Sequence, residues 1–267
     1  MPSSAAGERN GATLLITGHM GSGKSVLGGA IHSPPDVVIL DGLRAFAAVD
    51  LRYARHLRGL RPTGKRRVFR EAGAARGFAE YLVRLRLATP PTRKVNVGNV
   101  RRALAGVFPD AAVVGDAANS YLHHVERLGR HTIVKQVVVY RDGRDVAAEM
   151  KQRVGGIWRQ VAQSDDPPSW FRSIATPGAA AAHWGESIAR MEAHADQVRM
   201  VRYEDLIADP ADVLNPLAEW LGIEAPSWAD DYFRSDGIGV HRGILTDSEI
   251  SDVEEVAGPT LARLGYR

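Results

Sequence analysis

The sequence contains no cysteine, which excludes disulfide bonds and thiolate metal sites. No apolar run approaches the ~20 residues that a membrane-spanning helix needs, and the first residues hold no apolar signal-peptide core. These absences predict a cytoplasmic protein without a membrane span. We expect a disordered lead-in at residues 1–11, followed by a single domain at residues 12–267.

Lysine is scarce: five lysines stand beside 29 arginines, and the net charge is only +3. The charge is unevenly distributed, because residues 52–102 hold 15 Lys or Arg and only two acids, Glu71 and Glu80. Such a stretch either attracts an anionic ligand or forms a solvated helix surface, and both interpretations stay open. No basic segment is interleaved with aromatic residues, so nucleic-acid binding is not predicted.

Short β-type runs alternate with segments of helical spacing. An apolar run at residues 13–17 precedes a glycine-rich loop and a helical segment at 25–31, and a second buried run follows at 37–40. This order predicts a parallel strand pair with a right-handed crossover. Further strands are predicted at 132–140 and 198–203. The expected fold class is therefore α/β, with three layers and a mostly parallel central sheet flanked by helices.

Two other segments matter for the site. Helical spacing over residues 44–61 predicts a helix after the second strand. Residues 155–182 hold paired glycines and prolines and are expected to form an irregular lid or acceptor-binding segment. Four aromatic residues surround that segment and either line an acceptor pocket or anchor the long loop in the core. They are Trp158, Trp170, Phe171 and Trp184.

Residues 18–25 match the pattern G-x-x-x-x-G-K-S between a predicted strand and a predicted helix, which indicates a phosphate-binding P-loop. Backbone N–H groups would surround phosphate oxygens, and the helix N-terminus would add partial positive charge. Lys24 would reach a terminal phosphate or sulfate oxygen. The predicted nucleotide contacts of this loop are Gly21, Ser22, Gly23, Lys24, Ser25 and Val26.

Five later segments resemble bacterial members of the PAPS-dependent sulfotransferase family. The family patterns are, in order, D-K-x-P-x-Y-L, a strand followed by R-D-P-R-D-V-x-x-S, V-R-Y-E-D-L-x-x-D-P, R-K-G, and a final helix ending in L-G-Y. The matching segments are 116–122, 137–149, 201–223, 241–243 and 245–266. The resemblance implies a P-loop sulfotransferase fold, PAPS as the donor, PAP as the product, and a small-molecule or glycan acceptor. It leaves the acceptor's identity and the oligomeric state undefined.

The resemblance also implies residue roles at a 3′-phosphate site. Arg141 matches the arginine that grips the 3′-phosphate, and Arg242 with Gly243 matches the turn that closes over it. Glu149 stands where the family has a serine, and its carboxylate would repel a phosphate. We therefore expect Glu149 to turn away or to pair with a neighbouring arginine. The two arginines within reach are Arg144 and Arg153.

Sulfuryl transfer needs positive groups that hold the leaving phosphate, here called the anion clamp, and a base near the acceptor. Lys24 would supply the clamp. Asp41 ends the second predicted strand and would lie beside the loop, as the base or as a cap of the following turn. Arg44 would hold an acidic acceptor or the sulfuryl group, or lie on a surface helix. The reserve bases are Glu71, His123 and His124, whereas the pair Glu204 and Asp205 is expected to be structural.

The loop departs from the family's P-[KR]-S-G-T-T, because the cation has moved to Lys24. The G-S-G-K-S at 21–25 and the L-D-G at 40–42 resemble adenylylsulfate kinase instead. That alternative implies phosphoryl transfer from ATP, with Mg²⁺ held by Ser25. A third alternative is nucleotide binding without catalysis. The sulfotransferase interpretation predicts no metal site.

Overall fold

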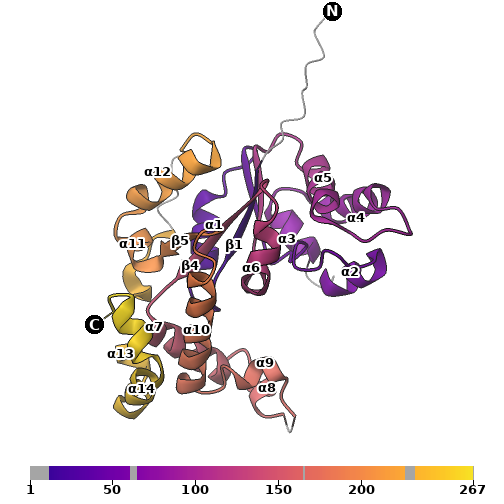
Figure 1. Ribbon diagram of the computed structural model, residues 1–267. Coiled ribbons are helices and arrows are strands. Elements are labelled where there is room, and N and C mark those ends of the chain that lie inside the picture. The colour runs from indigo at the N-terminus through magenta and orange to yellow at the C-terminus, as the bar shows by residue number, and fades with distance from the viewer. Residues whose placement is uncertain (1–11, 61–64, 165, 226–231, 267) are drawn as a thin grey trace, which may run out of the picture.

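The computed structural model describes residues 12–60, 65–164, 166–225 and 232–266. Within these ranges five strands form one sheet in the order β2-β3-β1-β4-β5, and every neighbouring pair is parallel (Figure 1). The strands are β1 (Ala12–Thr17), β2 (Val37–Asp41), β3 (Val113–Ala117), β4 (Val134–Tyr140) and β5 (Arg199–Arg202). The α/β prediction is confirmed.

Helices cover both faces of the sheet, as expected for three layers (Figure 1). Alternate strand residues face opposite sides, so Leu14 and Ile16 pack into one core cluster and Leu15 into another. The Leu14 face is covered by α1 (Lys24–Ile31), α11 (Tyr203–Ala208) and α12 (Pro210–Leu221). The opposite face is covered near β2 by α3 (Lys65–Glu71), α4 (Gly77–Ala88), α5 (Val97–Val107) and α6 (Val125–Gly129), and near β4 by α7 (Gly143–Gly155), α10 (Pro177–Glu192) and α14 (Asp247–Arg263).

The parallel register places the carboxyl ends of the strands at one edge of the sheet. Ile16 of β1 lies opposite Ala117 of β3, which in turn lies opposite Asp41 of β2. Open α/β sheets bind ligands at this edge. The loop after β1 and the residues that end β2, β3 and β4 therefore meet at one place.

Residues 44–50 form turns and not the first part of a helix, and α2 spans only Tyr53–Leu60. Arg44 and Asp50 both have positive φ, at 62° and 66°, which a right-handed helix cannot contain. Arg127 of α6 donates hydrogen bonds to the carbonyl oxygens of Phe46, Ala47 and Val49. These contacts use carbonyl groups that a helix would have paired internally.

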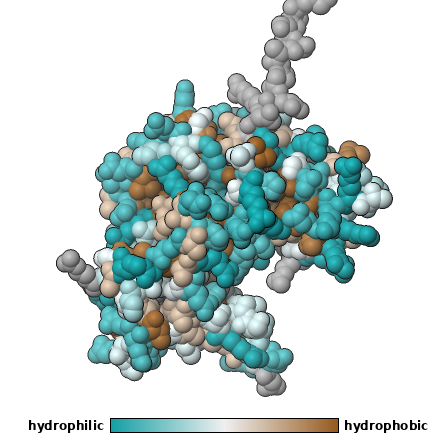
Figure 2. Space-filling model, in the orientation of Figure 1, coloured by the Kyte–Doolittle hydropathy of each residue, from teal (hydrophilic) through white to brown (hydrophobic). Residues whose placement is uncertain are grey.

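The segment 155–182 is less irregular than predicted, because it holds two short helices and the start of α10. The two are α8 (Arg159–Ala162) and α9 (Ser169–Arg172), which lie at the lower end of the molecule in Figure 1. Of its aromatic residues, Phe171 and Trp184 are buried, whereas Trp170 is 44% exposed. The face of the molecule that Figure 2 shows is mostly hydrophilic with scattered hydrophobic patches. No helix in the described ranges is long and apolar enough to cross a membrane.

Trp184 of α10 is fully buried and connects three parts of the core. Its ring packs on Gly143 at the start of α7, where an added Cβ would lie 2.7 Å from the indole. Its indole N–H donates to the carbonyl oxygen of Arg141 at 3.1 Å. The side chain thus anchors α10 against the end of β4.

We predict that Trp184→Ala lowers the free energy of unfolding by about 3–5 kcal/mol, because it opens a cavity and removes a buried hydrogen bond. Trp170→Ala is the matched control and should change stability by less than about 1 kcal/mol, since Trp170 is 44% exposed and lies outside the core clusters. Urea denaturation of both variants measures the difference. Equal losses in the two variants would contradict the assignment of Trp184 to the core.

Candidate functional site

The loop between β1 and α1 has the backbone of a phosphate cradle. Gly18 and Gly23 have φ values of 145° and 95°. A Cβ at Gly18 would overlap the carbonyl oxygen of Val139, and one at Gly23 would overlap the ring of Tyr203, so both positions require glycine. Gly23 caps α1, whose first N–H groups have no acceptor inside the helix. These groups and the helix dipole favour an anion at this position.

Lys24 is the cation of the loop. Its Nζ donates to the carbonyl oxygen of His19 at 3.2 Å, and burial lowers its pKa to about 8, although the charges of Asp41 and Glu149 oppose that shift. Arg153 and Arg44 lower the pKa further. Lys24 is therefore mainly cationic at neutral pH, but it is poorly solvated, which favours an anionic ligand over water.

Lys24 lines a cavity of about 480 Å³ at the carboxyl edge of the sheet. The cavity brings together most of the predicted site residues from the loop, from the turn after β2 and from α7. These are Gly21, Gly23, Lys24, Ser25, Val26, Asp41, Arg44, Arg141 and Glu149. Ser22 is buried beneath the loop and does not line the cavity.

A buried carboxylate holds the turn that follows β2. Asp116 accepts the backbone N–H groups of Leu43 at 2.9 Å and Arg44 at 2.5 Å, and it also accepts the hydroxyl of Tyr121. Burial raises the pKa of Asp116 to about 6 against these hydrogen bonds. The contacts stabilise Arg44 in a left-handed backbone conformation that costs about 1–3 kcal/mol for a residue other than glycine.

That turn presents two of the predicted catalytic residues to the cavity. Asp41, the last residue of β2, is exposed and lines the cavity. Arg44 also lines it, and its Nε is buried without a hydrogen-bond partner in the described part of the chain. The reserve bases His123 and His124 do not line it.

Arg141 joins the loop to two distant segments. It is 5% exposed and donates to the carbonyl oxygens of Gly21, at 3.1 Å, and Gly237. Its guanidinium also lies over the ring of Tyr203, 5.0 Å from the ring centre. The predicted phosphate-binding arginine is thus held in place by protein groups on several sides.

Glu149 pairs with two arginines that line the cavity. Its carboxylate accepts hydrogen bonds from Arg141 at 3.2 Å and from Arg153. Of the two expected alternatives, the structure shows pairing, and the partner is Arg153 and not Arg144. Arg144 instead pairs with Asp142 at 2.8 Å. The carboxylate therefore neutralises the two cations that a phosphate would contact.

The structure does not bring Arg242 and Gly243 into this cavity. Both lie on the short helix α13 (His241–Ile244), and Arg242 is exposed. An adjoining cavity of about 650 Å³ shares Arg141, Glu149, Arg153 and Tyr203 with the first but is not lined by Arg242 or Gly243 either. The buried carboxylate of Asp145 sets this geometry, because it binds the backbone of Gly239 and the ring of His241.

Glu204 has a structural role, as predicted. Its carboxylate accepts the N–H of Asp142 at 2.9 Å and the hydroxyl of Tyr266 at 2.9 Å, which ties α11 to the start of α7 and to the end of the chain. Asp205 follows it on α11 and lines neither cavity. Neither acid is therefore a candidate base.

A hydrogen-bonded pair of histidines, His19 and His183, holds the phosphate loop in place. The carbonyl of Met20 can only accept, so the Nδ1–H of His19 donates to it at 2.6 Å, and Nε2 of His19 accepts from Nδ1–H of His183 at 2.8 Å. Burial lowers the pKa of His19 to about 3, which keeps its ring neutral. Because the carbonyl of His19 accepts from Lys24, this pair anchors the loop that carries Lys24 to α10.

The sequence profile of the sulfotransferase family matches residues 54–230. The chain belongs to this family. The matched part begins after the phosphate loop and includes the ends of β3 and β4, Arg141 and α11. No curated protein sequence matches this sulfotransferase.

Solved structures agree with the fold of this sulfotransferase. A sulfotransferase from Alicyclobacillus acidocaldarius has a TM-score of 0.54 at 14% identity, covering 94% of this chain and 93% of that chain. The sulfotransferase domain of the curacin biosynthetic pathway has a TM-score of 0.51 at 16% identity, covering 96% and 98%. The sulfotransferase domain of the Synechococcus PCC 7002 olefin synthase has a TM-score of 0.50 at 17% identity, covering 93% and 94%.

Family membership selects sulfuryl transfer over the kinase alternative. One contact agrees with that choice. Walker-type enzymes hold Mg²⁺ with the loop serine and an aspartate on a strand. On β3, next to β1, that aspartate would be Asp116, whose carboxylate is already bound by three protein donors.

Sequence reasoning missed several residues that line the cavity. Tyr203 belongs to a recognised segment, but nothing in the sequence indicates that its ring packs on Gly23 and under Arg141. Asn119 and Arg153 also line the cavity, and no motif marks Asn119. Asp116 and Tyr121 do not line the cavity, but their hydrogen bond supports the turn that carries Arg44, and both lie in a segment that resembles the family.

We predict that His183→Ala lowers the free energy of unfolding by about 1–3 kcal/mol, because Nε2 of His19 is left buried without a donor. His183→Asn should recover part of this loss, since its amide N–H can donate. His131→Ala, at an exposed histidine, is the control. Urea denaturation at pH 7 compares the three variants. If His183→Ala costs no more than the control, the histidine pair does not hold the loop.

Proposed function

We propose that this sulfotransferase moves a sulfuryl group from PAPS to a hydroxyl or amine of a small molecule or glycan. The observation that carries the proposal is the convergence of Lys24, the loop N–H groups and Arg44 on one cavity that Asp41 also lines. Three sources of positive charge beside one exposed carboxylate suit an anionic donor and a proton-bearing acceptor. PAPS is the usual donor of the family to which the chain belongs.

The residues present fit the 5′ end of PAPS well. The glycine cradle and the N-terminus of α1 suit the 5′-phosphate, and Lys24 suits the bridging and sulfuryl oxygens. The adenosine would extend past Tyr203 into the adjoining cavity of about 650 Å³. The 3′-phosphate would then reach Arg141 and Arg153, where it has to displace the carboxylate of Glu149.

In the proposed reaction Asp41 accepts the proton of the acceptor while the acceptor's oxygen or nitrogen forms a bond to sulfur. The bond between sulfur and the bridging oxygen breaks, and its electron pair stays on the phosphate of PAP. Lys24 and the loop N–H groups neutralise the charge that develops on this leaving phosphate. Arg44, held by Asp116, binds the sulfuryl oxygens.

We predict that Lys24→Ala lowers kcat by about 10²–10³-fold, by analogy with the removal of one oxyanion donor. In the wild type, kcat/KM should fall as pH rises through about 8, because the free enzyme then loses the cationic form of Lys24. Lys24→Arg keeps its charge and should lose this alkaline limb. Initial rates between pH 6 and 10 measure both effects. An unchanged rate in Lys24→Ala would show that other residues neutralise the leaving phosphate.

A second prediction concerns Glu149 and the donor. PAP should raise the melting temperature without Mg²⁺, and Glu149→Ser should tighten PAP at least tenfold with little effect on ADP. The reason is that two like charges ~4 Å apart cost about 4 kcal/mol at an effective dielectric of 20. Titration of both proteins with both nucleotides gives four dissociation constants. If ADP binds tightly with Mg²⁺ and PAP binds to neither protein, the donor is ATP and not PAPS.

A further inference from the structure

A second cavity, of about 310 Å³, adjoins the first across Asp41. Ser25, Asp41 and Ala117 line both cavities, so a molecule in the second cavity would reach the carboxylate proposed as the base. The rest of its wall comes from α1, β2 and α3, with one side chain from residue 232. These residues are Gly28, Gly29, His32, Ile39, Val68, Glu71, Ala72 and Tyr232.

The charge of this second cavity is the reverse of that of the first. Lys24, Arg44, Arg141 and Arg153 line the first cavity, whereas the described lining of the second contains no Lys or Arg and two acids, Asp41 and Glu71. The contrast is unexpected from composition, because α3 lies within the most basic stretch of the chain. An anionic nucleotide is therefore favoured in the first cavity and disfavoured in the second.

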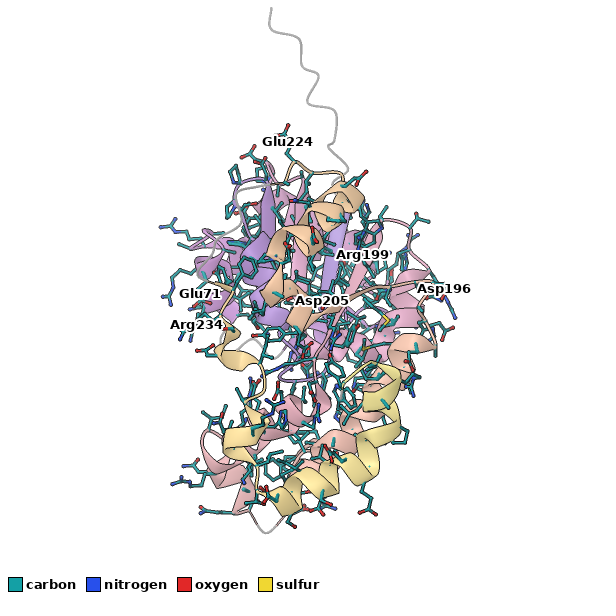
Figure 3. The ribbon with its side chains drawn as sticks, turned by 90° about the vertical axis from the view of Figure 1, so that its left-hand side faces the viewer. Glu71, Asp196, Arg199, Asp205, Glu224 and Arg234 are labelled. Atoms are coloured by element: carbon teal, nitrogen blue, oxygen red, sulfur yellow. The ribbon has the colours of Figure 1, made fainter. Side chains whose placement is uncertain are left out.

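The arginines near the second cavity do not line it and are paired with acids. Arg67 pairs with Glu71 at 2.6 Å on the exposed side of α3, and Arg234 pairs with Asp236 at 2.7 Å. Figure 3 shows Glu71 and Arg234 on the same flank of the molecule. The positive charge of each arginine is therefore offset by the acid it pairs with, and neither arginine lines the cavity.

The polar groups of the wall also define what can bind. Nδ1 of His32 accepts the N–H of Ile39 at 3.0 Å, and burial lowers the pKa of His32, so its ring is neutral with the proton on Nε2. That ring offers one N–H donor to a hydroxyl or carbonyl oxygen. The ring of Tyr232 lies against Gly29, where a Cβ would overlap it, and provides a flat aromatic wall.

We infer that this second cavity binds the acceptor, and that the acceptor is a compact, largely apolar alcohol or amine that is neutral or cationic. The inference rests on the proposed function, because it places the donor in the first cavity. Its volume is near the lower end of the range for small-molecule sites and suits one ring with a short substituent. Asp41 and Glu71 disfavour an acidic acceptor such as a sulfated or uronic acid-containing glycan, although Arg67 offsets part of the charge of Glu71.

The experiment uses three probes that share a phenol and differ in charge: tyramine, 4-ethylphenol and 4-hydroxyphenylacetate. Each is titrated calorimetrically into the full-length protein saturated with PAP. We expect tyramine and 4-ethylphenol to bind at least about tenfold more tightly than 4-hydroxyphenylacetate, since two carboxylates border the cavity. Tightest binding of the acid, or no measurable binding of any probe at millimolar concentration, would overturn the inference.

Charge reversal at Glu71 tests the location. Glu71→Lys should shift the ratio of affinities for tyramine and 4-hydroxyphenylacetate at least tenfold toward the acid. Glu80→Lys is the matched control, because Glu80 also forms an exposed i,i+4 pair with an arginine, Arg84, and lies outside the cavity. An equal shift in both variants would overturn the inference, since it would reflect net charge alone.

A third variant separates this inference from the proposed function. Val68→Phe narrows the cavity and should weaken all three probes at least tenfold while leaving the affinity for PAP unchanged. Unchanged probe affinity would place the acceptor elsewhere, although the donor site would stand. If the protein does not bind PAP, the proposed donor is wrong, and the same probes titrated into the free protein still decide what the cavity binds.

Discussion

The buried guanidinium of Arg141 is the interaction on which the arrangement of the site depends. It directly follows β4, yet it binds the phosphate loop through Gly21, the C-terminal region through Gly237, and α7 through Glu149. A planar group with five N–H donors can make these contacts at once, which a lysine cannot. A cation this deep in the protein needs a carboxylate or a bound anion nearby. Glu149, at 3.2 Å, and the buried Asp145, at 3.8 Å, supply that charge from within the chain.

The opposite side of the cavity is organised by a buried anion. Asp116 lies at the end of β3 and binds two backbone N–H groups of the turn after β2, and its pKa is raised to about 6 by burial. Removing the carboxylate would leave these N–H groups unpaired inside the protein. The site is thus held between a buried cation directly after β4 and a buried carboxylate on β3, with the glycines of the loop between them.

The strands and the phosphate loop could be predicted from sequence because residues within each segment determine its conformation. Runs such as residues 134–140 are apolar and β-branched, and the glycines of residues 18–23 are required by backbone conformations of positive φ. The turn at 44–50 could not, since Arg127 and Asp116 override its helical spacing from more than 70 residues away. The motif alone does not indicate that Arg242 lies outside both cavities, because the carboxylate of Asp145, in a distant helix, binds the backbone of Gly239 and the ring of His241.

The contact between Gly23 and Tyr203 has a consequence for how this chain can diverge. The two residues are 180 positions apart, yet the phenol ring fills the space that a side chain at position 23 would need. A larger residue at position 23 would meet the ring of Tyr203 and would also have to adopt a φ of 95°, so a smaller residue at position 203 would remove only one of the two obstacles. Residue 203 can therefore change while residue 23 stays glycine, but residue 23 cannot change first. The last part of the loop and the segment after β5 are, in that sense, coupled in one direction only.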